Sequence, residues 1–156
     1  VIPFYDRENS LIGFQGRSLD SYVIPKYLTV MLDEKSPKVY GLDKVNIEEE
    51  IYVTEGPFDS TFIGNSIAMC GSDVDLSDFN YRFIFVYDNE PRSREIVSKI
   101  TKTIEKSHKV VIFPPQIREK DINDMVLAGH DIKTLLESST YSGLEAKLKL
   151  QTWKRV

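Results

Sequence analysis

The chain has 156 residues, of which 41% are hydrophobic and 28% are charged, and its formal net charge is −4. This length and composition fit one compact domain with at most a small appendage, which can fold without a disulfide or a structural metal. The single cysteine, Cys70, excludes an intramolecular disulfide and a multi-cysteine zinc site, and it favours a cytoplasmic location.

The ends and the charge of the chain carry further information. No apolar run reaches the roughly 20 residues that span a bilayer, so we expect no membrane association. The chain opens at Val1 without a methionine and is strand-like at once, which suggests a fragment of a longer protein. An acidic balance gives no overall signature of nucleic-acid binding, but carboxylates that hold a divalent metal can still bind an anionic polymer. Net charge therefore leaves nucleic acid open as a partner.

The chain begins with a predicted hairpin. Residues 1–5 and 11–15 are apolar runs on either side of a polar turn. Gly13 and Gly16 indicate a bulge in the second strand, or a place where another backbone comes close.

The next segment is also mostly extended. Pro25 disfavours a helix in the residue before it, and residues 39–42 are typical of a short strand or turn. Residues 44–50 are polar, and we expect them to be partly helical. We therefore predict a β-rich N-terminal subdomain over residues 1–46.

From residue 51 the pattern alternates between strands and helices. Strands are predicted at 51–54, 66–70, 82–87 and 109–113, and helices begin near Pro57 and at 92–106. Such alternation implies right-handed crossovers and a parallel sheet flanked by helices. In the helix at 92–106, isoleucines form one stripe and the basic residues are expected to point outward: Arg94, Lys99, Lys102 and Lys106.

Short helices close the chain. They are predicted from Asp121 to just before Gly129, at 131–136 and at 142–153. We therefore divide the rest of the chain into a central α/β domain, 47–128, and a C-terminal helical segment, 129–156.

Three acidic residues directly follow predicted strands. Glu55 follows the strand at 51–54, and Asp88 and Glu90 follow the strand at 82–87. Parallel strands end at the same edge of a sheet, and in open α/β folds that edge binds ligands. Clustered carboxylates repel one another unless a cation offsets their charge, and oxygen ligands suit Mg²⁺. The alternative is a pair of solvated acidic loops that serve the following helix N-termini.

The acidic motifs resemble those of the Toprim family. That family carries Glu-Gly-x-x-Asp, then Asp-x-Asp, then a downstream aspartate-bearing segment. The corresponding segments here are Glu55-Gly-Pro-Phe-Asp59, Asp88-Asn-Glu90 and Lys120-Asp-Ile-Asn-Asp124. Glu90 stands where the family usually has a second aspartate, and with Pro91 after it this variant most resembles primases of tailed phages.

The upstream segments extend the resemblance to DnaG-type primases. In those proteins similar segments precede the Toprim domain, and here they are Ile12-Gly-Phe-Gln-Gly-Arg17, Pro25-Lys-Tyr-Leu28 and Val39-Tyr-Gly-Leu42. The resemblance covers residues 1 to about 128. It implies a Toprim-like parallel sheet flanked by helices, with a small β-rich subdomain before it and short helices after it.

The resemblance also implies roles for individual residues. Glu55, Asp88 and Glu90 would be the catalytic ligands of Mg²⁺ or Mn²⁺, and the site would be completed by further acidic residues: Asp59, Asp121 and Asp124. For Asp59 and Asp121 the alternative is that each only caps its own helix. Basic residues would contact nucleic acid or nucleotide: Arg17, Lys26 and Lys38.

The function implied is that of a DNA primase catalytic core. Such an enzyme is a nucleotidyltransferase that joins ribonucleoside triphosphates on a single-stranded DNA template, holds the RNA–DNA hybrid, and works with a replicative helicase through regions outside this chain. A phage-encoded version would act in the host cytoplasm. The alternatives are another Toprim enzyme, a nuclease or a topoisomerase fragment, and a non-catalytic DNA-binding module. No Gly-Lys-Ser/Thr phosphate loop is present, so the chain is not itself a helicase.

Overall fold

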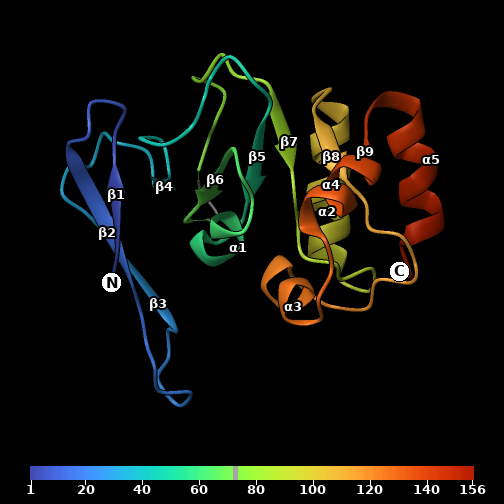
Figure 1. Cartoon of the computed structure of the whole chain (residues 1–156), viewed down its shortest axis with the longest axis horizontal. Helices are drawn as coiled ribbons and strands as arrows, with labels where there is room; N and C mark the ends of the chain where they lie inside the picture. Colours follow the sequence, from blue (N-terminus) through green and yellow to red (C-terminus); the bar gives the residue numbers. More distant parts are fainter. Residues whose placement is uncertain (72–73) are drawn as a thin grey trace.

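A computed structural model describes residues 1–71 and 74–156. It contains two sheets, a small N-terminal one and a larger one that carries the helices (Figure 1). The small sheet is antiparallel and consists of β1 (Ile2–Tyr5), β2 (Leu11–Arg17) and β3 (Tyr27–Met31), with β2 in the centre. The predicted hairpin is therefore present, and a third strand completes it.

Gly13 shows why the second strand carries a glycine. A Cβ atom at this position would lie 2.7 Å from the carbonyl oxygen of Val30 and 2.8 Å from Sδ of Met31, both in the neighbouring strand. The close approach at Gly13 is thus made by β3. At Gly16 the nearest atom would be the carbonyl oxygen of Leu28, at 3.9 Å, which is ordinary contact.

The larger sheet has the order β4-β6-β5-β7-β8-β9. Its strands are β4 (Val39–Tyr40), β5 (Ile51–Thr54), β6 (Ser66–Met69), β7 (Phe83–Phe85), β8 (Lys109–Val111) and β9 (Thr140–Tyr141). The four central strands are parallel, as predicted, and the two edge strands β4 and β9 are antiparallel to their neighbours. The parallel core of the expected fold is therefore present.

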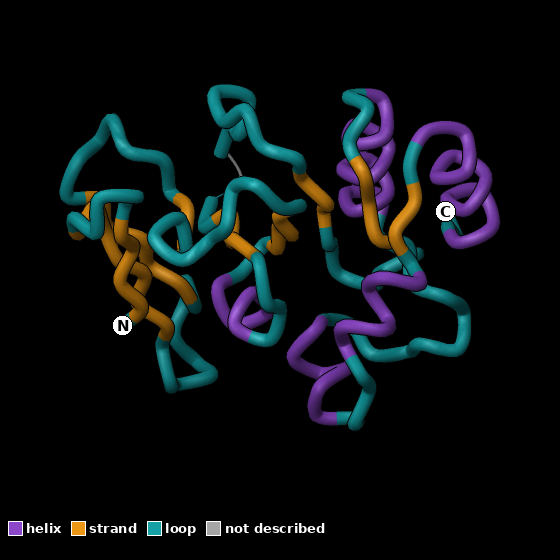
Figure 2. Tube along the Cα trace, turned by 45° about the horizontal axis from the view of Figure 1, so that its top comes forward, coloured by secondary structure: helices purple, strands orange, loops and turns teal. Residues whose placement is uncertain are grey.

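Helices cover both faces of the larger sheet. They are α1 (Pro57–Thr61), α2 (Arg94–Glu105), α3 (Ile122–Leu127), α4 (Ile132–Ser138) and α5 (Gly143–Trp153). Phe83 and Phe85 pack in one core with α2 and α5, whereas Ile84 and Val86 pack in the other with α3 and α4. Successive residues of a strand point to opposite faces, so burial on both sides explains the continuous apolar run of this strand. In Figure 2 the helices gather around the larger sheet, and the N-terminal sheet carries none.

The helix ends follow local rules. Ser93 is the N-cap of α2, because its Oγ accepts a hydrogen bond from the backbone N of Ile96 at 3.3 Å, so the helix begins after the predicted residue 92. The expectation of helix within residues 44–50 is wrong. The backbone there is bonded instead to the side chain of Asn65, whose Nδ2 donates to the carbonyl oxygens of Asn46 (2.9 Å) and Glu50 (3.0 Å).

The two sheets pack directly on each other. Phe4 of the small sheet is completely buried and lies edge-on to Tyr40 of the large one, with ring centroids 6.4 Å apart. Oγ1 of Thr29 donates to the carbonyl oxygen of Cys70 at 3.3 Å. The boundaries 1–46, 47–128 and 129–156 remain a prediction. Among the described residues, no helix is long and apolar enough to cross a membrane.

Candidate active site at the carboxyl edge of the sheet

The ladder between β5 and β7 places the acidic residues of both strands at one edge. Val53 pairs with Phe85, so Glu55 and Asp88 follow two and three residues after paired positions of neighbouring parallel strands. Beyond β5 the chain turns at Gly56, the N-cap of α1, and Pro57 occupies the first turn of that helix. The edge predicted from the sequence therefore exists, and Glu55, Asp88 and Glu90 lie along it.

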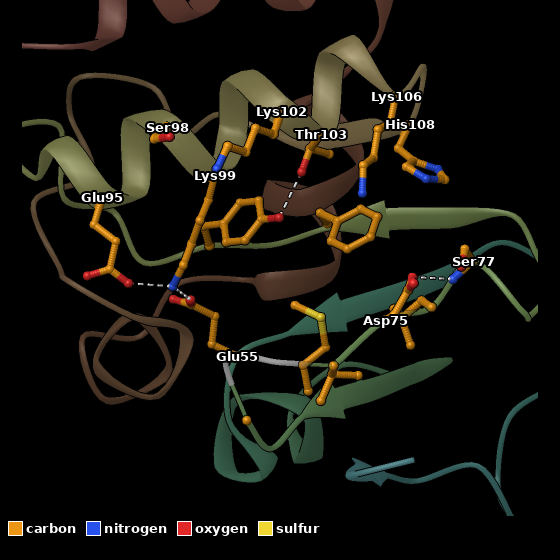
Figure 3. Close-up of a pocket in the computed structure, with 16 residues that line it drawn as sticks. Glu55, Asp75, Ser77, Glu95, Ser98, Lys99, Lys102, Thr103, Lys106 and His108 are labelled. Carbon is orange, nitrogen blue, oxygen red and sulfur yellow. Dashed lines mark hydrogen bonds and ion pairs between the residues drawn. The ribbon is translucent and has the colours of Figure 1, made fainter. Parts of the chain in front are cut away.

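Each of these three carboxylates is paired with a lysine. Nζ of Lys99 hydrogen-bonds to Oε1 of Glu55 and lies 2.8 Å from Oε1 of Glu95 (Figure 3). Nζ of Lys120 lies 3.4 Å from Oδ2 of Asp88 and 3.6 Å from Oε2 of Glu90. Lys99 was expected to point outward from its helix, and that expectation is wrong, because its ammonium group reaches the sheet edge.

Asp59 belongs to the same acidic group but does not cap its own helix. Its Oδ1 accepts a hydrogen bond from the backbone N of Asn123 at 3.0 Å and so joins α1 to the first turn of α3. Asp121 does cap its helix, since its Oδ1 accepts a bond from the backbone N of Asp124 at 2.8 Å. The capping alternative therefore describes Asp121 but not Asp59.

The pKa values show that these carboxylates repel one another. Burial, together with the charges of three other aspartates (Asp121, Asp88 and Asp124), raises the pKa of Asp59 to about 6, against the effect of the hydrogen bond from Asn123. Burial and then the charge of Glu55 also raise the pKa of Asp88, and Lys120 acts in the opposite direction. The edge thus concentrates negative charge that a cation would offset.

Asn89, between the two acidic residues, ties the edge together. Its backbone N donates to the carbonyl oxygen of Lys120 at 2.6 Å. Its Nδ2 donates to the carbonyl oxygens of Ile117 and Glu119, both at 3.0 Å, and its Oδ1 accepts from Nε1 of Trp153 at 3.2 Å. One side chain therefore fixes the 88–90 loop against both the loop before α3 and the C-terminal helix.

The donor set fits a hard divalent cation in its chemistry. All the candidate ligands are carboxylates, and those at the strand ends already bind ammonium groups. As the side chains lie, no group of three or more acidic, histidine or cysteine residues in the described part of the chain is arranged to hold a metal ion. A metal would thus require the carboxylates to turn away from their lysines.

The candidate nucleic-acid residues lie mainly on the small sheet. The guanidinium of Arg17 lies 4.8 Å from the ring centroid of Phe58 and 5.5 Å from that of Tyr27, so it connects the small sheet to α1. Arg17 and Lys26 line a common cavity of about 380 Å³. Lys38 precedes β4, and its carbonyl oxygen accepts a hydrogen bond from the backbone N of Cys70 at 2.8 Å.

A second cavity, of about 800 Å³, opens beside Glu55 (Figure 3). Phe85 and Tyr87 form part of its lining, and Lys99 and Lys102 of α2 line it as well. The hydroxyl of Tyr87 lies 2.7 Å from Oγ1 of Thr103, which fixes the ring beneath the helix.

Comparison with known proteins gives a consistent result. The chain is 32% identical, over its whole length, to the DNA primase of Enterobacteria phage T4. It is 29% identical, over 61% of its length, to the DNA primase of Legionella pneumophila. The resemblance to DNA primases is confirmed. The chain spans about half (47%) of the phage primase and 20% of the Legionella primase, and no family model matches it.

Solved primase structures share the fold. The E. coli primase catalytic core superposes with a TM-score of 0.67 at 20% identity, covering 94% of this chain and 53% of that chain. The zinc-binding and RNA polymerase domains of the Aquifex aeolicus primase superpose with a TM-score of 0.68 at 22% identity, covering 90% of this chain and 40% of that chain. The Toprim-like α/β fold expected from the motifs is therefore confirmed.

Four residues of the site were not predicted: Asn89, Lys99, Lys120 and Trp153. Lys120 and Asn89 stand inside the acidic motifs, so their position was a usable signal. Lys99 gives only the weaker signal of a lysine four residues after Glu95. Its bond to Glu55 spans 44 residues of sequence, and the bond between Trp153 and Asn89 spans 64.

Proposed function

We propose that the chain is the catalytic core of a DNA primase, which joins ribonucleoside triphosphates into short RNA primers on single-stranded DNA. The observation that carries this proposal is the 32% identity to a phage DNA primase across the entire chain. As part of the same proposal, the enzyme acts in the cytoplasm, of the host if it is phage-encoded, and works with a replicative helicase through regions outside this chain. The three segments 1–46, 47–128 and 129–156 are proposed as its domains.

Glu55, Asp88 and Glu90 are proposed as the ligands of Mg²⁺ or Mn²⁺. Asp59, Asp121 and Asp124 complete the acidic edge or hold a further ion. When bound, such ions lower the cost of deprotonating a hydroxyl nucleophile and stabilise the charge of an in-line phosphoryl transfer. The role of the chain is then to position oxygen donors, and Asn89 does so by fixing the loop that carries Asp88 and Glu90.

Glu55 has a second proposed role. Its carboxylate lies between the acidic edge and the large cavity, where it could accept the proton of the primer 3′-hydroxyl. Positioning and electrostatic stabilisation supply most of the rate in phosphoryl transfer, so the loss of one edge carboxylate is expected to cost much of the activity.

Arg17, Lys26 and Lys38 are proposed to contact the template, the RNA–DNA hybrid or the incoming nucleotide. A DnaG primase catalytic domain solved with single-stranded DNA shares this fold, with a TM-score of 0.64 at 18% identity. The Arg17 guanidinium lies over the rings of Tyr27 and Phe58 and so reaches toward α1, the helix that follows Glu55. Binding should weaken steeply with salt, because phosphate contacts release counterions.

Primer synthesis from labelled ribonucleotides on single-stranded DNA, with Mg²⁺ or Mn²⁺, tests the proposal. Short RNA products are expected, and Glu55→Gln should reduce them by about 100-fold or more. Glu105→Gln makes the same change at an exposed position at the end of α2 and should leave synthesis unchanged.

Two other results would contradict the proposal. DNA cleavage that is lost in Glu55→Gln would indicate a nuclease built on the same edge. No primer synthesis and no cleavage, together with no metal binding by calorimetry, would favour a non-catalytic module. Metal binding that is lost in Asp88→Asn, without activity, would instead indicate an intact site that needs the remaining parts of the protein.

A further inference from the structure

The carboxylates of the acidic edge already hold two cations, and these cations belong to the chain itself. Lys99 bonds to Glu55 from α2, and Lys120 contacts Asp88 and Glu90 from the loop before α3. The side chains of Glu55 and Asp88 are only 29% and 25% exposed, so water cannot fully screen their charges. Without a metal, the lysines are the groups that offset this repulsion.

The position of Lys99 differs from that of an ordinary surface lysine. Its side chain is 33% exposed, and its ammonium group lies between Glu55 and Glu95, as Figure 3 shows. Lys102, one turn further along α2, lines the same cavity, but no carboxylate contact is found for it within residues 1–71 and 74–156. Two lysines of one helix, on one cavity wall, thus differ in whether they contact the acidic edge.

A metal ion and an ammonium group would compete for the same oxygen atoms. Mg²⁺ requires carboxylate lone pairs in a nearly ideal octahedral geometry, and an oxygen bonded to an ammonium group offers it fewer of them. Each lysine is tethered to the protein, so it competes at a high local concentration at any concentration of metal.

We propose that Lys99 and Lys120 are resident counter-ions of the acidic edge, which hold its carboxylates in the metal-free protein and are displaced when a divalent cation binds. The two lysines then set the metal affinity of the site and keep the repelling carboxylates in place until metal arrives. This inference rests on the metal site of the proposed function, and the test below distinguishes failure of one from failure of the other.

The first measurement is Mn²⁺ affinity by calorimetry at pH 8. Lys99→Gln and Lys120→Gln are each expected to bind Mn²⁺ about two- to fivefold more tightly than the control, since a partly exposed ion pair contributes that much. The control is Lys102→Gln, which removes the same charge from the same helix and so measures the general electrostatic effect. Urea unfolding of each variant confirms that it is folded.

The second measurement follows the ammonium groups directly. The unmodified chain is treated with an amine-reactive reagent, with and without Mg²⁺, and each lysine is quantified by mass spectrometry. Displacement predicts faster labelling of Lys99 and Lys120 with Mg²⁺ and no change at Lys102.

The outcomes separate the two proposals. If the unmodified chain binds Mn²⁺ and the variants bind no more tightly than Lys102→Gln, the inference is wrong and the metal site stands. Tighter binding without a change in labelling also overturns displacement, because the lysines would then only repel the metal from nearby without occupying its ligands. If Mn²⁺ binds only when both lysines are replaced, the metal site stands but displacement is overturned, because the lysines would then block the site rather than leave it. If neither the unmodified chain nor that double variant binds, both proposals fail.

Discussion

Replacing Asn89 by alanine tests whether the acidic edge is positioned by this side chain. The change removes three hydrogen bonds: two from Nδ2 to the carbonyl oxygens of Ile117 and Glu119, and one from Trp153 to Oδ1. A hydrogen bond contributes about 0.5–1.5 kcal/mol net, and water can replace part of it at a half-buried position. We therefore expect Asn89→Ala to lower the free energy of unfolding by about 2 kcal/mol.

The loss of metal binding should be larger than this destabilisation explains. Without these three bonds the 88–90 loop keeps its backbone bond from Asn89 to Lys120 but is held less firmly against the loop before α3, so Asp88 and Glu90 lose part of their common orientation. Removing a residue that orients metal ligands typically weakens binding by about tenfold or more. We expect Mn²⁺ affinity, measured by calorimetry, to fall by about tenfold in Asn89→Ala.

Asn65→Ala is a matched control. Asn65 also makes three side-chain hydrogen bonds, to the backbone of Asn46 and Glu50, at distances of 2.8–3.0 Å, and it is half-buried as well. It joins the loop before β5 to the start of β6 rather than the acidic edge. Asn65→Ala should lose about 1–2 kcal/mol of stability by urea unfolding and keep its metal affinity. Equal Mn²⁺ affinity in the two variants would refute the positioning role of Asn89.

Three further predictions concern other parts of the molecule. Gly13→Ala should lower the free energy of unfolding by about 1–3 kcal/mol, because its Cβ would lie 2.7 Å from the backbone of the neighbouring strand. The control Gly16→Ala should change the free energy of unfolding by less than about 0.5 kcal/mol. Equal urea midpoints for the two variants would contradict this prediction. The pKa of Asp59 in the folded protein, about 6, lies above its ordinary value of 3.8. Between pH 3.8 and about pH 6, the folded state therefore binds a proton at Asp59 more strongly than the unfolded state does. In metal-free protein, the free energy of unfolding of the unmodified chain should therefore rise relative to that of Asp59→Asn as the pH falls from 6.5 to 4. The expected gain is about 1 kcal/mol after allowance for solvent screening. A difference between the two proteins that does not change with pH in urea unfolding would count against this prediction. Arg17→Met should reduce the slope of log affinity for single-stranded DNA against log salt by about one, and Arg118→Met, at an exposed loop position, should not.

Local patterns in the sequence were sufficient for much of the fold. The β-branched and aromatic run before Glu55 predicts a strand, and Gly56 and Pro57 predict the turn and helix that follow it. The isoleucine stripe of α2 is buried as its spacing indicates: Ile96, Ile100 and Ile104. These features depend on the period of a helix or strand and on residues next to each other, so they can be recognised without tertiary information.

The composition of the acidic edge was likewise predicted from sequence, since parallel strands place their carboxyl ends together. Glu55 and Asp88 follow neighbouring strands in the structure as expected. The turn structure of residues 44–50 and the edge strand β9 were not anticipated. Both depend on partners distant in sequence: the side chain of Asn65 for the first, and β8 for the second.

The partners of the acidic residues were decided only by tertiary structure. Lys99 meets Glu55 because the cavity that both residues line places α2 opposite the end of β5, and Asp59 meets the backbone of Asn123 because α3 packs beside α1. A helix period shows which face of α2 is polar, but not which polar residue will reach another element. The sequence by itself therefore determined which carboxylates gather at one edge of the sheet. The tertiary packing determined which cations and which hydrogen-bond donors hold them there, because those contacts join residues 30 to 64 positions apart.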